Sequence, residues 1–443
     1  MRSPLNKDTQ KTIPIPYTFR SKDGFTIVEL LIVVVVIAIL AAITIVSYNG
    51  ITNRALQATM QSDLQSSATI LVSDNSMNGS YPETAEAANG GRGLPESGDN
   101  VVAYMREGSD YCVTVTNPKT PQVYYLSSLN GQIQSGSCTD AGNNWIARAA
   151  PAANQWSKIG YGNGIFVLAA HGSLSVPEAP AVASTSPNGA TWSTPLAIGS
   201  GPATDPTPIY AGGRFVTVFD TGRIQSAASD DGKIWQHATS AGPIFSYRGA
   251  SVAYGAGTYV ATVATPPSSY TYVYTSTDGI NWTLRSTPIA WNGWPAVTYG
   301  NGKFVSVANS GTNQAMVSTD GINWTLSGAT PSGSWSSITF GNGKFVAVAS
   351  SGTNRIMTST DGITWTAQSA PEANSWRSVV YGNGKFVAVA NSGTNRVMTS
   401  PDGVTWTARA AAEANSWNSV AYGGGCFVAV ATTGTNRVMT SCW

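Results

Sequence analysis

The sequence predicts a multidomain protein in which a long N-terminal α-helix with a small α+β head precedes an all-β seven-bladed propeller. Three observations lead to this fold class. An apolar run begins at Phe25 and continues as an amphipathic pattern, and a turn-rich unit recurs seven times after residue 150. All 14 Trp lie at or after Trp145, so the composition changes there as at a domain boundary. The length of 443 residues also favours two or more domains over one core.

Charge and chemistry-bearing residues exclude several function classes. Charged residues make up 11% of the chain and the formal net charge is +1, so no strong field is available for nucleic acid. The two histidines, His171 and His237, occupy unrelated positions, and no cluster has metal-ligand spacing. No nucleophile elbow or phosphate loop stands out. We therefore expect no enzyme, no catalytic residues, no metal, no cofactor and no nucleic-acid partner.

The pattern of the N-terminal segment predicts a leader followed by a membrane helix. Residues 1–24 are polar, with five Lys and Arg against two Asp. Residues 25–46 are apolar except for Thr26, Glu29 and Thr44, and a helix of that length could span a bilayer. The general interpretation is a signal anchor, and a secretory signal cut after the apolar core is the competing one. Glu29 separates them, because a carboxylate inside an apolar helix is costly and usually marks a function.

The stretch Gly24-Phe25-Thr26-Ile27-Val28-Glu29-Leu30-Leu31 resembles the prepilin cleavage motif of type IV pilins and pseudopilins. The resemblance implies that a prepilin peptidase cuts between Gly24 and Phe25 and that the new N-terminus is methylated. It also implies that Glu29 pairs with the Phe25 amine of a neighbouring subunit during filament assembly, which removes two buried charges together. Many type IV pilins carry a proline near the end of the apolar stretch, whereas this chain has none between Phe25 and Ser80.

Residues 25–138 are expected to form the pilin module that the resemblance implies. An amphipathic pattern over residues 51–71 extends the helix to about residue 76, and residues 82–100 are expected to form a loop. Strand-like runs follow at residues 110–116 and 122–127, which suit a small sheet packed on the helix.

The four cysteines allow three pairings on the sequence alone. The pilin resemblance implies a disulfide between Cys112 and Cys138, because pilins commonly enclose the last section of the head in this way.

The strongest internal signal is a repeat that covers residues 139–443. The aromatic residue before a Gly turn recurs at intervals of 41 to 49 residues, at Tyr161, Tyr210, Tyr254, Tyr299, Phe340, Tyr381 and Tyr422. Seven units of this length match a propeller of four-stranded blades. In the unit that begins at Trp376, strands are expected at residues 376–381, 386–390, 396–400 and 404–408.

The two ends of the repeat region are expected to meet in one blade. The last unit stops before its own fourth strand, and residues 140–150 carry a spare copy of the corresponding element, so they should complete the last blade. The hairpin register of the repeat places Cys426 directly opposite Cys442 on neighbouring strands. A cross-strand Cα separation suits a disulfide, so we expect this pair to be bridged.

The Asp-Gly-x-x-Trp turns resemble the Asp-box of sialidases and related propellers, shortened by one residue. The resemblance implies a structural turn on the blade periphery, away from any active centre. We expect that role for Asp231, Asp278, Asp320, Asp361 and Asp402. The first copy has Asn188 instead, and the copy at residues 140–145 has an inserted Ala.

Aromatic and amide residues mark a candidate ligand face, because Trp rings can stack on sugars while Asn groups bond their hydroxyls. The candidates are Trp291, Trp294, Trp335, Trp376, Trp417, Asn313, Asn354, Asn395 and Asn436. The alternative is that most of these Trp pack between blades, because they share a repeat position. Trp291 lies outside that position and is the freer candidate.

The pilin resemblance and the propeller together favour a minor or tip subunit of a type IV pilus-like filament that displays the propeller for adhesion to a surface, glycan or protein. Its partners would be other pilins, the prepilin peptidase, the cytoplasmic membrane and a glycan or protein receptor. It would sit in that membrane as a single-pass protein before assembly and on the extracellular pilus afterwards. The alternatives are a major pilin with a propeller coat, or a pseudopilin of a secretion or DNA-uptake system.

Overall fold

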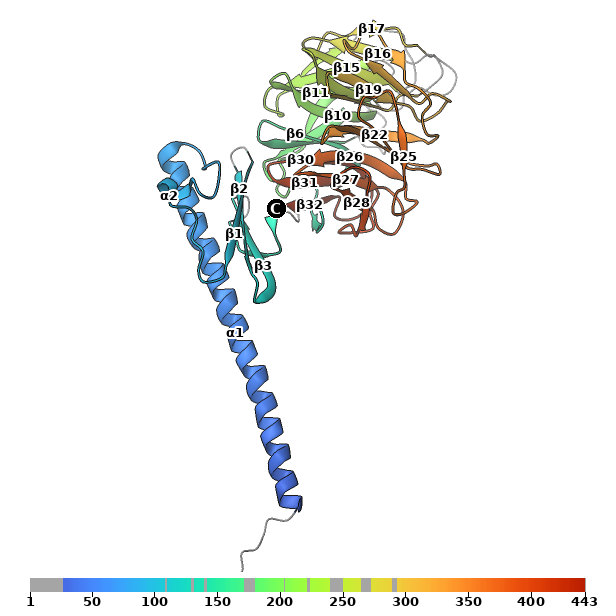
Figure 1. Cartoon of the computed structure of the whole chain (residues 1–443). Coiled ribbons are helices and arrows are strands. Elements are labelled where there is room, and N and C mark those ends of the chain that lie inside the picture. The colour runs from blue at the N-terminus through green and yellow to red at the C-terminus, as the bar shows by residue number, and fades with distance from the viewer. Residues whose placement is uncertain are drawn as a thin grey trace, which may run out of the picture. The chain divides into compact units, whose positions relative to one another are not determined.

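The structure of the protein is a computed structural model that separates into two compact units, residues 1–58 and 59–443 (Figure 1). It describes residues 27–107, 110–128, 131–138, 142–170, 180–202, 204–220, 224–239, 250–263, 272–288 and 293–442.

The first unit is the N-terminal part of helix α1 (Ile27–Asn78), which continues without a break into the second unit. Its described apolar side chains are exposed; Val28, Leu31 and Ile37 are 66%, 61% and 60% accessible. Gly24 and Phe25 lie outside the described residues, as does the side chain of Glu29. Across the described residues, none of the helices combines the length and sustained apolar character that a bilayer span needs. The membrane helix at residues 25–46 stays a prediction.

The head of the second unit is a four-stranded antiparallel sheet packed against the C-terminal part of α1. Its strands lie in the order β1 (Val101–Glu107), β2 (Asp110–Asn117), β3 (Thr120–Ser127) and β4 (Gln134–Ser135). Met60 and Leu64 of the helix are fully buried with Val113 and Val115 of the sheet. Cys112 and Cys138 form a disulfide with a Cα–Cα distance of 5.8 Å, as the pilin resemblance implied.

Two features of the head differ from the sequence prediction. Strands β1 and β4 were not predicted, and the segment before β1 includes a short helix, α2 (Ala88–Gly91). This segment is fastened to α1 by the buried carboxylate of Asp63, which accepts bonds from the Ser97 N–H at 2.8 Å and the Asn100 Nδ2 at 2.7 Å. A local pattern could not reveal these bonds, because the partners are more than 30 residues apart.

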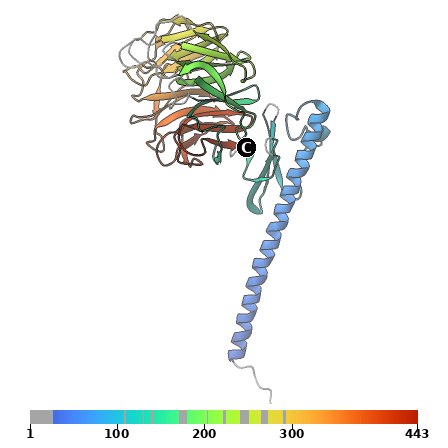
Figure 2. The same ribbon diagram turned by 180° about the vertical axis from the view of Figure 1, so that it is seen from behind.

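Seven four-stranded antiparallel sheets follow, which confirms the predicted propeller (Figures 1 and 2). Blade 1 consists of β6 (Trp156–Gly162), β7 (Ile165–Ala170), β8 (Pro180–Ser186) and β9 (Leu196–Pro202), and blade 2 of β10 (Thr204–Ala211), β11 (Arg214–Asp220), β12 (Ile224–Ser229) and β13 (Gln236–Thr239). Blade 3 consists of β14 (Ala250–Gly255), β15 (Thr258–Val263), β16 (Tyr272–Ser276) and β17 (Thr283–Arg285), and blade 4 of β18 (Ala296–Gly300), β19 (Lys303–Val307), β20 (Ala315–Ser318) and β21 (Thr325–Leu326). Blades 5 to 7 are β22 (Trp335–Gly341), β23 (Lys344–Ala349), β24 (Ile356–Ser359), β25 (Thr366–Gln368); β26 (Trp376–Gly382), β27 (Lys385–Ala390), β28 (Val397–Ser400), β29 (Thr407–Arg409); and β30 (Trp417–Gly423), β31 (Cys426–Ala431), β32 (Val438–Cys442), β5 (Ile146–Arg148).

The outer strand of blade 6 starts later than the sequence predicted. In blade 6, β29 begins at Thr407, whereas a start at Val404 was expected. The reason is that the N–H groups of Val404 and Thr405 both donate to the Asp402 carboxylate at 2.8 Å, which keeps them in the turn.

Blade 7 is built from both ends of the propeller. Strand β5 pairs with β32, so that Thr440 faces Ile146 and Val438 faces Arg148. Cys426 faces Cys442 in the predicted register, and the two form a disulfide with a Cα–Cα distance of 4.0 Å.

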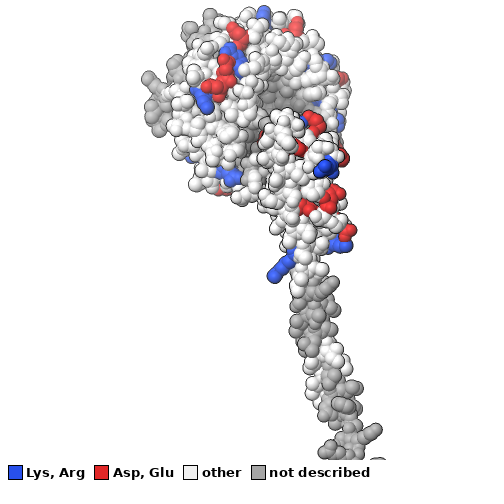
Figure 3. All heavy atoms as spheres, turned by 90° about the vertical axis from the view of Figure 1, so that its left-hand side faces the viewer, with Lys and Arg blue, Asp and Glu red and all other residues white. Residues whose placement is uncertain are grey.

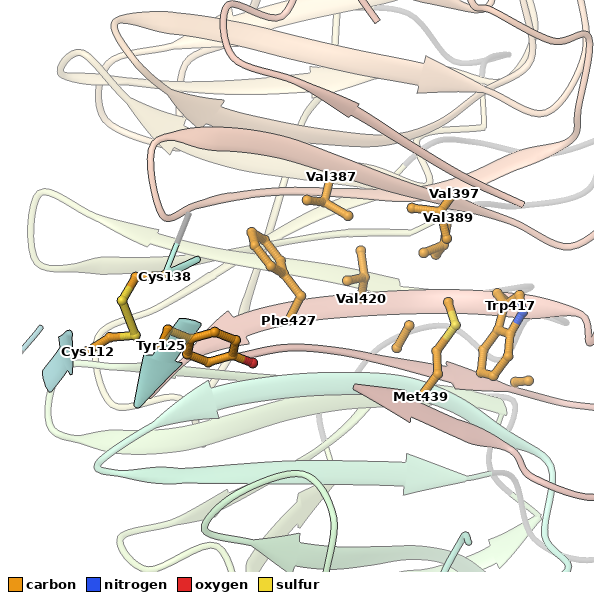
Figure 4. Close-up of a cluster of buried hydrophobic side chains, with 12 residues drawn as sticks. Cys112, Tyr125, Cys138, Val387, Val389, Val397, Trp417, Val420, Phe427 and Met439 are labelled. Atoms are coloured by element: carbon orange, nitrogen blue, oxygen red, sulfur yellow. A yellow bond between two sulfur atoms is a disulfide. The ribbon is translucent and has the colours of Figure 1, made fainter. Parts of the chain in front are cut away.

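The blades pack through layers of β-branched and aromatic side chains. Figure 4 shows this layer between blades 6 and 7, where Val387 and Val397 of one blade lie with Trp417 and Phe427 of the next; the Cys112–Cys138 disulfide is drawn in the same view. All four propeller side chains are fully buried.

The aromatic-Gly pair that defines the repeat has a packing function. An added Cβ at Gly382 of blade 6 would lie 2.1 Å from the ring of Tyr422 in blade 7, and one at Gly423 would lie 1.9 Å from the ring of Tyr161 in blade 1. In six of the seven blades the aromatic ring of the following blade lies directly on this glycine, whose lack of a side chain permits the contact, whereas blade 2 has Ala211 in its place.

Candidate functional site

The loops that join the second and third strands of blades 4 to 7 form a polar rim with exposed tips. We call residues 310–312, 351–353, 392–394 and 433–435 the rim tips; all twelve are exposed. Each tip has a central Gly followed by Thr, at Thr312, Thr353, Thr394 and Thr435. Four successive blades thus present the same small, uncharged, hydroxyl-bearing group.

A carboxylate below the tip braces the loop in blades 6 and 7. In blade 7, Glu413 accepts hydrogen bonds from the Asn436 Nδ2 at 2.5 Å and from the Asn415 Nδ2 at 3.0 Å. The Asn436 bond, against a smaller opposing effect of burial, holds the pKa of Glu413 below its usual value. Blade 6 repeats this arrangement with Glu372, which accepts from Asn395 Nδ2 at 2.5 Å. Sequence reasoning missed both glutamates, although the repeated Glu-Ala-Asn-Ser-Trp stretch was a signal for them.

The repeated arginines link each loop to the next blade. Arg396 Nη1 donates to the Asn415 carbonyl at 2.7 Å, and Arg437 Nη1 donates to the Asn154 carbonyl at 2.6 Å. The second of these bonds crosses from blade 7 to the segment that enters blade 1. These guanidinium groups are therefore engaged in holding the rim together.

The predicted Trp ligand face is wrong for four of its five members. Trp294, Trp335, Trp376 and Trp417 are 0% exposed, so no ring face is available for a sugar. They pack between blades, and three of them donate their indole N–H to the carbonyl four residues earlier; Trp376 donates to Glu372 O at 3.3 Å. The fifth, Trp291, lies outside the described residues.

The amide candidates lie beside the rim tips and are half-buried. Asn395 and Asn436 are used in the glutamate braces, and Asn313 also has an interaction partner. Asn354 occupies the equivalent position in blade 5. Their place in the fold thus suits loop support, and the exposed groups nearby are the Ser and Thr of the rim tips.

The Asp turns lie at the outer strands and have one repeated geometry. In blade 5, the Asp361 Oδ1 accepts the N–H groups of Ile363 and Thr364 at 2.8 Å, and the Trp365 indole donates to the Gly362 carbonyl at 3.2 Å. Asp231, Asp278, Asp320 and Asp402 accept the corresponding two N–H groups in their own turns. Asn188 makes the same two bonds with its amide oxygen, at 3.0 and 3.1 Å.

The seventh of these turns is divided between the two ends of the propeller. In five of the other turns, exemplified by Gly403, the glycine N–H donates to the hydroxyl of a preceding serine, here Ser400 at 2.8 Å. In the seventh, the Gly142 N–H donates to Ser441 Oγ at 2.7 Å, and Trp145 closes the turn on the Gly142 carbonyl at 3.0 Å.

The carboxylates of these turns make the propeller sensitive to acid. The backbone N–H of Thr364 is the largest influence on Asp361, and the pKa of this carboxyl falls from 3.8 to about 2 despite the opposing effect of burial. A lowered pKa stabilises the folded state fully above the unfolded value of 3.8, and this stabilisation is lost as pH falls towards about 2. We therefore expect the melting temperature of the propeller to fall between pH 4 and pH 2 in calorimetry.

Two substitutions of Asp361 distinguish the contribution of its charge to stability from the contribution of its hydrogen bonds. Asp361→Asn should leave the melting temperature at pH 7 nearly unchanged, as Asn188 makes the same bonds, and should reduce the decline in acid. Asp361→Ala should cost about 1 kcal/mol at pH 7, because two backbone donors lose their partner. Equal stability of the Asn and Ala variants at pH 7 would contradict this account.

The first strands of the blades enclose a channel of about 340 Å³. Its lining includes Lys158 at the start of β6 and Arg377 at the start of β26; no carboxylate is found among its lining residues. Figure 3 shows one face of the molecule, on which most visible atoms belong to uncharged residues and Lys, Arg, Asp and Glu gather in a few small groups.

The histidines show no metal site within the described parts of the chain. His237 is exposed on β13, whereas His171 lies outside the described residues. No group of three or more His, Cys, Asp or Glu is placed to hold a metal ion there.

Comparison with known proteins addresses the two ends of the chain separately. A model of the prokaryotic N-terminal methylation motif matches residues 19–45, the stretch that includes Gly24, Phe25 and Glu29. This match agrees with the resemblance to pilins drawn from the same residues.

Solved structures match the propeller. A catalytically inactive virginiamycin B lyase from Staphylococcus aureus with quinupristin has 13% identity and a TM-score of 0.56, and the match covers 68% of this chain and 100% of the lyase. YCF48 bound to D1 peptide has 15% identity and a TM-score of 0.50, with 68% of this chain and 96% of that one covered. At these identities the likeness concerns the fold alone. The chain therefore joins a pilin-like N-terminus, carrying a prokaryotic methylation motif, to a seven-bladed β-propeller.

Proposed function

We propose that the protein is a minor or tip subunit of a type IV pilus-like filament that displays its propeller for adhesion. The methylation motif supports processing by a prepilin peptidase and assembly with other pilins. In this proposal the N-terminal helix is held in the cytoplasmic membrane as a single pass until assembly. Glu29 then pairs with the methylated Phe25 amine of a neighbour, and the propeller lies on the outside of the filament. No catalytic step belongs to the proposal.

The observation that carries the adhesive role is the repetition of the rim tips. Thr312, Thr353 and Thr394 occupy the same place in blades 4, 5 and 6, each exposed on its loop, and in blade 6 the Glu372 brace holds the loop of Thr394 in position. Loops that are already ordered lose little entropy on binding. Several identical weak contacts can combine into strong attachment to a repetitive surface such as a glycan.

The test is a glycan-array screen of the full-length protein in an uncharged detergent. Hits are then measured with a triple variant in which Thr312, Thr353 and Thr394 are changed to Glu. The matched control changes Thr325, Thr366 and Thr407 to Glu, because these are also exposed threonines but lie on the outer strands of the same blades. We expect the rim variant to lose at least 10-fold in apparent affinity and the control to keep its affinity.

Equal binding by the two variants would show that the rim tips are not the surface that binds the glycan. If no glycan binds, the glycan receptor is excluded and attachment of producing cells to a protein-coated surface tests the remaining receptor class. The abundance of the chain in sheared filaments decides its place in the filament. High copy number would indicate a major pilin with a propeller coat, whereas retention in the membrane without filaments would indicate a pseudopilin.

A further inference from the structure

The channel wall contains a ring of hydroxyl groups that link successive blades. Ser337 Oγ accepts the N–H of Val379 in the next blade at 3.1 Å, and Ser378 Oγ accepts that of Val420 at 3.3 Å. The same bond joins blade 7 to blade 1, where Ser419 Oγ accepts the N–H of Ile159 at 3.3 Å. A serine hydroxyl that accepts in this way still has its own proton to donate.

Blade 1 departs from this ring in a way that introduces a positive charge. Lys158 stands where blades 5, 6 and 7 have serine, two residues after the first Trp. In blade 2, the residue whose N–H would be accepted by a side chain at position 158 is Pro208. Proline has no N–H and therefore needs no acceptor. The half-buried Lys158 side chain is therefore not required for the link between blades, and Lys158 is one of the residues that line the channel.

Blade 6 contributes the second charge. Arg377 follows the first Trp of its blade and is exposed, whereas Ser336 holds the same position in blade 5 and donates to the Trp376 carbonyl at 2.7 Å. Blades 6 and 1 both adjoin blade 7, so Arg377 and Lys158 belong to the blades on either side of the one that carries Ser419. Within the described part of the chain, neither cation is paired with a carboxylate.

We propose that this channel binds an oxyanion through Lys158, Arg377 and the free hydroxyl protons of Ser378 and Ser419. The wall offers cationic and hydroxyl donors without a lining carboxylate, and it also includes buried apolar residues such as Ile159 and Val420. Charges beside low-dielectric walls attract a counter-ion more strongly than the same charges on an open surface. A carboxylate on a sugar and inorganic sulfate share the chemistry that this site recognises, and a volume of about 340 Å³ accommodates either.

The test is equilibrium dialysis of the full-length protein in an uncharged detergent at low ionic strength. Labelled sulfate and glucuronate are the anionic probes, and glucose is the neutral one. We expect one anion bound per chain and no retention of glucose. Tighter binding of glucuronate would indicate a sugar carboxylate, and tighter binding of sulfate would indicate an inorganic ion.

Lys158→Ser and Arg377→Ser each install the residue that a neighbouring blade carries, so the fold tolerates them. Each should weaken anion binding at least 10-fold. Lys233→Ser removes an equal charge from an exposed outer turn and should leave affinity unchanged. Failure of both anions to bind above glucose, or unaltered affinity in the Lys158 variant, would overturn the proposal. The site is separate from the rim tips, so either proposal can fail alone.

Discussion

Replacing Trp376 by alanine is expected to lower the free energy of unfolding of the propeller by about 3–5 kcal/mol. The indole is fully buried with Val348 and Ile356 of blade 5 and with Met398 of its own blade. Its removal leaves a large cavity at the blade interface and also breaks the bond to the Glu372 carbonyl. Calorimetry of the full-length chain in detergent measures the shift of the propeller transition.

Trp376→Phe is the matched control, because it keeps an aromatic ring and loses only part of the volume and the indole N–H. It should cost about 1–2 kcal/mol. A Trp376→Ala protein that unfolds within 0.5 kcal/mol of the natural one would show that the ring is not buried. The result also bears on binding experiments, because a Trp376→Ala variant that fails to bind a ligand has lost its packing.

Replacing Gly382 by alanine is expected to destabilise the propeller by about 1–3 kcal/mol or more. The new Cβ would lie 2.1 Å from the Tyr422 ring, which is closer than any real contact, so blade 7 must shift relative to blade 6. The ring cannot move away easily because it also lies 4.5 Å from the ring of Phe427, measured between centroids.

Gly328→Ala is the control for this substitution. An added Cβ there meets only the Ile363 carbonyl oxygen at 3.7 Å, an ordinary contact distance. Its unfolding free energy should stay within about 0.5 kcal/mol of the natural value. Equal losses in the two variants, measured by denaturant unfolding, would show that the cost arises from glycine's backbone freedom and not from the aromatic ring.

The sequence predicted the propeller because its information is periodic. The recurrence of Tyr381-Gly382 and its counterparts gave the number of blades, and opposed positions in one hairpin gave the Cys426–Cys442 pair. The closing strand β5 was predicted for the same reason, because a copy of the repeat element lay on the wrong side of the first unit. In each case one repeat could be compared with the six others.

What the sequence could not predict depends on which way a side chain faces and on distant partners. Periodicity placed Trp335 and Trp376 at the start of their blades but did not say that their rings turn between the blades. The brace from Glu413 to Asn436 joins residues 23 apart on different loops. The role of Lys158 could not be predicted for a different reason. Position 158 need not supply an acceptor, because the residue opposite it in the adjacent blade is a proline without an N–H.

The divided seventh blade has a consequence for how the protein is made. Strand β5 is synthesised before the other strands of the propeller, whereas its pairing partner β32 is synthesised after all of them. The ring can close only once β32 has been made, and the Cys426–Cys442 bridge can form only then. Such a pairing between distant segments is slow, so the unfinished chain exposes an open edge for longer than a propeller with local closure would. Deletion of Val438–Cys442 should therefore leave the edge of blade 7 open in newly made chains.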